Sequence, residues 1–553
     1  MPDFSFDGRP VPYRTGQSLA AALTEAGIRV FRQTAKGAER GIFCGMGVCQ
    51  DCLVTVNAVP NLRACMTKAA EGLEVLTQVA FADLRLAAAA PATAQARILE
   101  PEVLVIGGGA GGLSAAIAAR RSGASVVVLD ERRVAGGQYY KQSVEGAPLD
   151  VQQSEGAELM AEAQASGAEI LGAVEIWGAF DGPLFLAEHE GAALIARPRT
   201  VIVATGAYER PCIVPGWTLP GVMTTGAAQT LWRSYRTLPG RRVAVCGSGP
   251  LNMQVALELA EGGARVAMVA EAAASPLAHP WAGLRMALAG PVLAAKGLTM
   301  LRGLRRHGVP VRNATVLTAV TQTKNGLLAA FRTAKGRQTS VEVDALCMND
   351  GFEPQNEILR LLGADMEYDA AFGHLRCVRM EQCETSVPGL FAVGDCAGPG
   401  GAPAARTEGR IAGQAAAARA GHGDAHDLHA DQRELRRHRR FQKWLWRLHS
   451  VAPRSLADTP PETILCRCEE ITLGQVREGV RTTPGHVGTL KRATRVGMGR
   501  CQGRYCGSVS ARLVAEATGG VIDDRSHFAP RVPVKPVSIA AILAAQETLD
   551  GLD

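Results

Sequence analysis

The chain has 553 residues, of which 47% are hydrophobic and 20% charged, and its formal net charge is +6. A chain of this length exceeds what one hydrophobic core usually serves, so three or four domains are expected. The composition is that of an α/β protein and excludes a disordered or fibrous one. The densest basic run, Arg433 to Arg440, has no recognition motif beside it. We therefore interpret it as a solvated helix face, and no nucleic-acid partner is expected.

Two features of the chain bear on its location. Its first ten residues, MPDFSFDGRP, lack the basic and apolar regions of a secretory signal, and no unbroken apolar run reaches the roughly 18 residues that a spanning helix needs. The sequence therefore predicts a cytoplasmic protein without a membrane span. In a reducing compartment, its 14 cysteines are expected to be metal ligands, reactive thiols or buried side chains rather than disulfides.

A first group of cysteines follows the spacing C-x4-C-x2-C-x12-C: Cys44, Cys49, Cys52 and Cys65. This spacing resembles that of plant-type [2Fe–2S] ferredoxins, whereas zinc more often uses paired C-x2-C motifs. The residues before it predict a hairpin around Asp7-Gly8 and a helix that ends near Gly27. We expect a β-grasp [2Fe–2S] domain over residues 1–80 and an Ala/Pro-rich linker over 81–100.

A second group consists of two close pairs separated by a helix-length stretch: Cys466, Cys468, Cys501 and Cys506. Such pairs can bring four thiolates together, and segment 460–525 resembles the small helical [2Fe–2S] domain of the bacterioferritin-associated ferredoxin type. That family's second pair is often C-x2-C, whereas here it is C-x4-C, so zinc stays open as an alternative. The other six cysteines are expected to be small buried hydrophobic residues.

Residues 101–133 predict a strand, a glycine turn, a helix and a second strand. Gly107, Gly109 and Gly112 occupy the G-x-G-x-x-G positions, where backbone N–H groups and a helix N-terminus can meet a pyrophosphate. Asp130 and Glu131 close the second strand, at the distance at which an acid bonds the adenosine ribose. Together these residues predict a dinucleotide site.

Three later segments resemble the glutathione reductase-like flavoproteins and imply that the dinucleotide is FAD. TSVPGLFAVGDC resembles their second FAD motif, whose aspartate bonds the ribityl chain, and GGQ lies where that family passes its chain near the flavin. VIVATGAYERP resembles the strand and turn by which the chain crosses between the FAD half and the inserted domain. The resemblance predicts a discontinuous FAD domain over 101–217 and 341–420. The residues that it places at FAD are Gly137, Gln138, Thr205, Gly206, Gly394 and Asp395.

The inserted segment, 218–340, repeats the pattern of strand, turn, helix and strand. Gly247 and Gly249 are in place, but Asn252 stands where a third glycine would allow close helix–strand packing. Glu271 stands just past the position of a ribose-binding acid. Three interpretations stay open: an NAD(P) site, a site for another adenine nucleotide, or a retained fold without a ligand.

Several long sequence motifs resemble those of the flavoprotein α subunits of opine oxidases, hydroxyproline and proline dehydrogenases, and hydrogen cyanide synthase. Among them are ATGAYERPCIVPGWTLPGVMTTGAAQ and GRCQGRYC. The N-terminal domain resembles a small separate subunit of those systems, or the N-terminus of heterotetrameric sarcosine oxidase α. The expected fold is therefore α/β, with two dinucleotide-binding domains of the glutathione reductase type between two [2Fe–2S] domains. A basic helical linker is expected at 421–459 and a tail at 526–553.

The resemblance implies an electron-transfer subunit of a heteromeric dehydrogenase or oxidase. A partner flavoprotein similar to D-amino-acid oxidases would oxidise the C–N bond of a secondary amine, imino acid, opine or glycine. This chain would pass the electrons through FAD and two [2Fe–2S] clusters to an acceptor. No catalytic residue is assigned, because the sequence shows no cysteine pair after GGQ and no nucleophile elbow. The alternative is a self-sufficient NAD(P)H-dependent reductase that sends electrons outward through the clusters.

Overall fold

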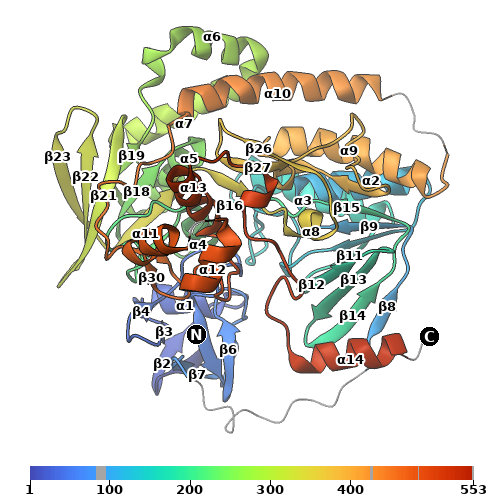
Figure 1. Ribbon diagram of the computed structural model, residues 1–553, viewed down its shortest axis with the longest axis horizontal. Helices are drawn as coiled ribbons and strands as arrows, with labels where there is room; N and C mark the ends of the chain where they lie inside the picture. The colour runs from blue at the N-terminus through green and yellow to red at the C-terminus, as the bar shows by residue number, and fades with distance from the viewer. Residues whose placement is uncertain (82–94, 424–427, 484, 551–553) are drawn as a thin grey trace.

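The computed structural model describes residues 1–81, 95–423, 428–483 and 485–550. The predicted linker at 81–100 thus lies largely outside the described residues. Figure 1 shows the N-terminal sheet below the helices α11, α12 and α13, the FAD-type half to the right, and helices α6 and α10 along the upper edge. Within the described residues, no helix has both the length and the apolar character needed to cross a membrane.

The N-terminal sheet has the strand order β2-β1-β7-β5-β6 and is crossed by one helix. The predicted hairpin and helix are confirmed: Asp7 and Gly8 make the turn with positive φ, and the helix is capped by the side chain of Ser18. The elements are β1 (Asp3–Phe6), β2 (Arg9–Pro12), α1 (Leu19–Glu25), β3 (Arg32–Gln33), β4 (Glu39–Arg40), β5 (Leu53–Val56), β6 (Val59–Arg63) and β7 (Glu74–Thr77).

The sheet that carries the first glycine turn is parallel, in the order β11-β10-β9-β15-β28. Along its central strand, Val103 and Val105 pack against helices, whereas Leu104 and Ile106 face a second sheet of order β12-β13-β14-β8. The elements are β8 (Arg97–Leu99), β9 (Val103–Ile106), α2 (Ala110–Arg121), β10 (Val126–Leu129), α3 (Val151–Ala165), β11 (Glu169–Leu171), β12 (Val174–Phe180), β13 (Leu184–His189), β14 (Ala192–Ala196), β15 (Thr200–Val203), β28 (Leu390–Ala392) and α9 (Ala402–Arg419).

Helices α2 and α9 approach closely because small residues line their contact. A Cβ atom on Gly409 would lie 2.2 Å from the carbonyl oxygen of Gly111, and one on Gly413 would lie 2.3 Å from that of Ala115. Such distances are shorter than any side chain tolerates, so glycine is required for this helix pair. The close pair fixes the start of α2 beside the start of α9, where the two FAD motifs lie.

The inserted segment forms a second parallel sheet, in the order β17-β24-β18-β19-β20, with an antiparallel sheet of β21, β22 and β23 beside it. The chain crosses into and out of this region through β16 (Ala207–Glu209) and β25 (Phe352–Pro354), which pair antiparallel. The other elements are β17 (Val222–Thr224), α4 (Thr225–Tyr235), β18 (Arg242–Gly247), α5 (Pro250–Glu261), β19 (Arg265–Glu271), α6 (Pro280–Ala289), α7 (Pro291–Arg306), β20 (Val311–Arg312), β21 (Thr315–Thr323), β22 (Gly326–Thr333), β23 (Gln338–Val343) and β24 (Ala345–Asn349).

The last third of the chain is mainly helical. It contains α8 (Glu357–Leu361), β26 (Met366–Asp369), β27 (His374–Cys377), α10 (His429–His449), β29 (Ile464–Cys466), β30 (Ile471–Thr472), α11 (Leu473–Thr482), α12 (Val487–Thr494), α13 (Gly507–Thr518) and α14 (Ile539–Asp550). Within the expected C-terminal tail, Ala541, Ala544 and Ala545 of α14 pack against Trp177 and Ile195 of the second sheet.

A buried ion-pair cluster joins the FAD-type half to the inserted segment. Arg233 of α4, with no exposed side-chain surface, lies 2.8 Å from Asp150 at the start of α3 and 2.8 Å from Glu258 of α5. Removing this cation would leave the nearly buried Glu258 carboxylate without its positive partner, with the amides of Gln229 and Gln254 still donating to it. Arg233→Ala should therefore lower the free energy of unfolding by about 3–5 kcal/mol.

Urea denaturation followed by circular dichroism measures this change. The matched control is Arg481→Ala, which removes a solvent-exposed partner of Glu478 and should leave the midpoint almost unchanged. Equal midpoints for the two variants would contradict a structural role for the Arg233 cluster.

Candidate cofactor site

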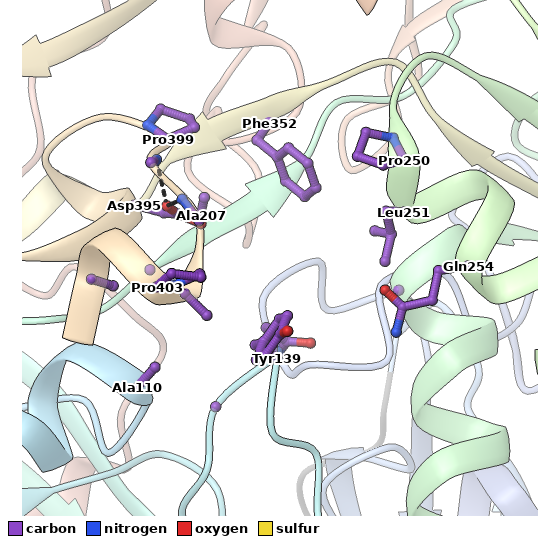
Figure 2. A pocket seen from close by; sticks show the side chains of 18 of the residues that line it. Ala110, Tyr139, Ala207, Pro250, Leu251, Gln254, Phe352, Asp395, Pro399 and Pro403 are labelled. Carbon is purple, nitrogen blue, oxygen red and sulfur yellow. Dashed lines mark hydrogen bonds between the residues drawn. The ribbon is translucent and has the colours of Figure 1, made fainter. Parts of the chain in front are cut away.

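One large cavity of about 1550 Å³ lies between the first glycine turn, the inserted segment and the start of α9. Figure 2 shows Tyr139 and Ala110 on one side of it, Asp395 and Pro403 on another, and Leu251 and Gln254 of α5 across the opening. Of the residues predicted to hold FAD, those on the cavity wall are Gly107, Gly109, Asp130, Glu131, Gly137, Gln138, Thr205, Gly206, Gly394 and Asp395. The volume suits a dinucleotide rather than a small metabolite.

The first glycine turn has the geometry that its motif predicts. Gly107 has φ of 106°, and a Cβ on it would lie 2.4 Å from the carbonyl oxygen of Ala204. Gly112 does not line the cavity; a Cβ there would lie 1.8 Å from the carbonyl oxygen of Gly107, which identifies its role as close helix–strand packing. A bare backbone and the N-terminus of α2 therefore face the cavity, as a pyrophosphate requires.

Asp130 lies at the end of β10 and is held by that turn. Its carboxylate accepts hydrogen bonds from the backbone N–H of Gly108, at 2.5 Å, and of Arg132, at 2.7 Å. Burial raises the pKa of Asp130, although these two N–H groups act in the opposite direction. The structure thus brings the predicted ribose-binding acid next to the glycine turn and the cavity.

Glu131, the neighbouring acid, is engaged in ion pairs with two distant segments. It lies 3.3 Å from Arg63 of the N-terminal domain and 2.6 Å from Lys535 near the C-terminus. Burial raises its pKa, but the charges of Lys535 and Arg63 outweigh burial and the net pKa lies below the usual value. The Glu131 side chain lines the cavity, and its main role there is to link the FAD-type half to the N-terminal domain and to the C-terminal segment.

Asp395, in the second FAD motif, lies beside the N-terminus of α9. Its Oδ1 accepts hydrogen bonds from the backbone N–H of Gly400, at 2.8 Å, and of Gly401, at 3.0 Å; Figure 2 shows this group at the cavity. Burial raises the pKa of Asp395. On the opposite side, a Cβ on Gly137 would lie 2.8 Å from the Cα atom of Gly109, so the GGQ segment packs directly on the first glycine turn.

Several charged residues of the cavity wall were not predicted from the sequence, among them Lys141 and Glu209. Lys141 is buried and its Nζ donates to Gln229 Oε1 at 2.8 Å and to the carbonyl oxygen of Gly226 at 3.2 Å. Glu209 accepts from the backbone N–H of that same Gly226, at 2.8 and 2.9 Å. Burial lowers the pKa of Lys141 to about 7 and raises that of Glu209 to about 7.

The first four predicted cysteine ligands come together as two pairs. Cys44 lies within hydrogen-bond reach of Cys49, and Cys52 within reach of Cys65. All four side chains are buried. Burial raises the pKa of Cys44, but the neighbouring thiol and three backbone N–H groups, including that of Met46, outweigh it and lower the pKa to about 6. N–H groups directed at a thiolate fit ligation of an iron–sulfur cluster.

The second four cysteines pair in the same way, Cys466 with Cys506 and Cys468 with Cys501. The Cys506 thiol and backbone N–H groups, including that of Gly497, lower the pKa of Cys466 to about 7 against burial. The described residues contain no group of three or more His, Cys, Asp or Glu side chains arranged to hold one metal ion. Two facing pairs are the arrangement that a two-iron cluster uses.

A hydrogen-bonded ion pair connects the two cysteine loops. Arg467, between Cys466 and Cys468, donates from Nε to Oδ2 of Asp51, between Cys49 and Cys52, at 2.6 Å. The guanidinium also lies 4.0 Å from the ring centroid of Phe43. Burial raises the pKa of Asp51, but Arg467 and two further arginines outweigh it and hold the pKa below its usual value. The pair is therefore ionised inside the protein.

Each cysteine loop also reaches the large cavity. Met46, between Cys44 and Cys49, lines it, and so does Arg504, between Cys501 and Cys506. Tyr505 is buried between the loops, with its ring centroid 5.4 Å from that of Phe43. Both predicted clusters and the predicted FAD site thus adjoin one another, an arrangement that sequence spacing alone did not reveal.

The glycine turn of the inserted segment is covered by the end of α10. The hydroxyl oxygen of Ser248, between Gly247 and Gly249, lies 2.8 Å from the carbonyl oxygen of His449 and 2.8 Å from Oε1 of Glu271, and its single proton is shared between these two acceptors. Glu271 is buried, accepts from the backbone N–H of Gly249 at 3.2 Å, and lies 3.4 Å from His449 Nδ1. The structure brings the predicted residues Gly247, Gly249 and Glu271 together, but none of them lines the large cavity.

Asn252 stands where a third glycine was expected, and its side-chain amide makes two buried hydrogen bonds. The side chain accepts from the hydroxyl of Thr225 at 2.8 Å and donates to the carbonyl oxygen of Asn349 at 3.1 Å. The asparagine therefore ties α5 to the start of α4 and the end of β24, which replaces the close packing that glycine provides elsewhere.

Three family models match the chain. The model described as pyridine nucleotide-disulphide oxidoreductase matches residues 101–409, and the 2Fe-2S iron-sulfur cluster binding domain matches residues 2–80. The sarcosine oxidase A3 domain matches residues 463–546. The first of these covers more than half of the chain and contains both glycine turns described above.

Individual proteins are similar over the same region. An opine oxidase subunit of Rhizobium meliloti (strain 1021) is 32% identical over 385 residues, which cover 68% of this chain and 83% of the relative. Hydrogen cyanide synthase subunit HcnB of Pseudomonas aeruginosa is 31% identical over 357 residues, covering 62% and 75%. The crystal structure of L-proline dehydrogenase from P. horikoshii shares the fold, with a TM-score of 0.74 at 20% identity over 98% of this chain and 97% of that one.

The fold class and the suspected family are thereby confirmed. Paired FAD motifs on one cavity, an N-terminal [2Fe–2S] domain and the similarity to the opine oxidase of R. meliloti point to the same group of proteins. The chain belongs to the FAD-dependent pyridine nucleotide-disulphide oxidoreductase family, together with its opine oxidase relatives.

Proposed function

We propose that this chain is the FAD- and iron–sulfur-carrying electron-transfer subunit of a heteromeric dehydrogenase or oxidase. The observation that carries the proposal is the meeting of both cysteine loops with the large cavity, through Met46 and Arg504. When bound, FAD accepts two electrons as a hydride and releases them singly, while each [2Fe–2S] cluster carries one. The second cluster, the domain limits predicted above and the ligand set are part of this proposal.

The substrate class follows from the relatives. Opine oxidase and hydrogen cyanide synthase are named for the compounds they act on or form, and both relatives are named as subunits. We infer a C–N bond of a secondary amine, imino acid, opine or glycine as the site of oxidation. The oxidation itself belongs to a partner flavoprotein similar to D-amino-acid oxidases. In this chain, Lys141 and Glu209, which are buried at the cavity wall and contact the same Gly226, are the groups that we propose to hold a proton there.

A self-sufficient NAD(P)H reductase is the second candidate, because the inserted segment keeps its glycine turn. Two contacts weigh against it. The carboxylate of Glu271 is already bonded to Ser248 and Gly249, and the backbone of His449 lies over the turn. A nicotinamide dinucleotide in the usual position would have to displace the end of α10. The same contacts count against another adenine nucleotide at this turn.

The FAD assignment can be tested at the second motif. Asp395→Ala removes a charged acceptor beside the cavity and the acceptor of two loop N–H groups, so FAD affinity should fall by roughly 1.5–3 kcal/mol, about tenfold to a hundredfold. Flavin content and fluorescence titration of the apoprotein measure this loss. Asp181→Ala, at an exposed turn, is the control. Unchanged affinity in the Asp395 variant would argue against its role.

The cluster assignment can be tested at the ion pair between the loops. The purified chain should contain about four irons, with acid-labile sulfide and not zinc. Asp51→Asn keeps the side-chain shape but removes a negative charge next to both loops, so cluster midpoint potentials should rise by tens of millivolts. Spectroscopic redox titration measures the shift. Asp523→Asn, distant in sequence and exposed, is the matched control. Potentials that stay equal in both variants would refute the proposed proximity.

The two candidate functions can be separated by anaerobic mixing. The isolated chain should show little flavin reduction by amines, whereas a complex with its partner flavoprotein should copurify and be reduced by a secondary amine, imino acid, opine or glycine. Absorbance near the flavin maximum follows the reaction. Rapid bleaching of the isolated chain by stoichiometric NADH or NADPH, with no partner found, would replace the subunit proposal by the reductase.

A further inference from the structure

Helix α6 lies along the upper edge of the molecule in Figure 1, and several of its large apolar side chains are exposed. On α6, Trp281 is 75% exposed and Leu288 is 74% exposed, with Leu284 between them at helical spacing. Leu277 before the helix and Val292 after it are 89% and 67% exposed. Solvent-facing side chains of this size rarely lie together on a protein without a binding role.

The opposite face of α6 already packs against the protein. Ala282 is 5% exposed, and Met286 lines the large cavity. The turn after α6 is covered by Phe441 of α10, whose ring would lie 2.6 Å from a Cβ on Gly290. Leu277 also lines the large cavity, whereas the exposed side chains of Trp281, Leu284 and Leu288 neither line it nor belong to the buried core.

The adjacent helix α10 presents a basic face beside this apolar one. Its exposed cations recur every three or four residues: Arg433, Arg436, Arg440, Lys443 and Arg447. Two contacts make the surfaces continuous. Arg437 donates from Nε to the carbonyl oxygen of Ala289 at 3.2 Å, and Arg285 of α6 lies 5.0 Å from the ring centroid of Trp444.

Acidic residues are scarce in the two chain segments that contain α6 and α10. Residues 272–306, which include α6 and α7, contain five Lys and Arg and no Asp or Glu, and residues 435–457 also contain no acid. Asp431 and Glu434, at the start of α10, are each paired at 2.7 Å with Arg410 of α9. The surface of α6 and α10, which we call the α6–α10 surface, thus combines exposed apolar side chains with a strongly positive field.

We propose that the α6–α10 surface binds the anionic headgroups of a phospholipid membrane, with the apolar face of α6 in the interface. Helices that lie in this position have Trp and Leu on one face and Lys or Arg beside it. Each Lys or Arg near an anionic surface adds to the attraction, and Trp prefers the headgroup level. The basic run of α10 is then more than a solvated helix face, because it supplies the charge that attracts the lipid.

The combination favours lipid over the other polyanions. A nucleic-acid surface would use the arginines but would leave Trp281, Leu284 and Leu288 in water. The sheet that carries the first cysteine loop lies at the opposite edge of the molecule from α6 and α10 (Figure 1). Membrane binding through this surface would therefore leave the N-terminal domain facing away from the lipid.

Flotation of the full, flavin-loaded chain with vesicles tests the proposal. Vesicles of phosphatidylcholine with roughly one quarter phosphatidylglycerol should carry the protein at low salt, whereas pure phosphatidylcholine should carry little of it. The double variant Trp281→Glu/Leu288→Glu should lose binding at least tenfold. Arg433→Glu and Arg440→Glu should each weaken it by about fivefold or more.

The controls change the same residue types elsewhere. Val521→Glu replaces a side chain that is 89% exposed, and Arg9→Glu reverses an exposed charge on β2; both should bind like the unmodified chain. Equal binding by all variants, or no binding to anionic vesicles, would overturn the proposal. Loss of partner copurification in the α6 variants, with no vesicle binding by any protein, would make the surface a protein interface instead. Amine-dependent flavin reduction in the complex, measured in parallel, reports separately on the proposed function.

Discussion

The buried ion pair between Asp51 and Arg467 is the contact on which the arrangement of this molecule depends. Each partner lies between two cysteines, and both side chains are withdrawn from water, with exposed fractions of 1% and 4%. A charge in such a place is tolerated only with its counterion, and separating the two would cost several kcal/mol. The two cysteine loops are therefore held as one unit, although they are 416 residues apart in the chain.

A second set of charges fastens this unit to the flavin half. Arg63, two residues before Cys65, pairs with Glu131 after β10 and with Glu175 of β12, and Lys535 reaches Glu131 from the far end of the chain. The N-terminal domain, the FAD-type sheet and the C-terminal segment thus share one carboxylate at the rim of the cavity. The same position that sequence patterns associate with ribose binding here also joins three parts of the protein.

Short-range patterns predicted much of this structure, because glycine turns and cysteine spacing are read within a few tens of residues. The hairpin at Asp7-Gly8 and the glycine turn at Gly107 follow from local backbone geometry, whereas Gly112, predicted with the dinucleotide-binding residues, packs on Gly107 instead of lining the cavity. Contacts between distant segments could not be predicted. Nothing near Glu271 in the sequence indicates that His449 lies over it, and nothing marks Lys141 and Glu209 as neighbours of the same glycine. A set of aligned relatives would be the signal able to single out such pairs.

The packing of α10 and α14 has a consequence for how the second cysteine domain can work. Helix α10, which precedes that domain, packs against α6 and α9. Helix α14, which follows it, packs against β14, and the backbone N–H of Val534 donates to the carbonyl oxygen of Trp177. A domain anchored on both sides cannot act as a swinging carrier that travels between docking stations. Electron transfer within such a chain does not require a domain to move. Its rate is therefore set by the fixed distances between the redox groups and does not depend on solvent viscosity.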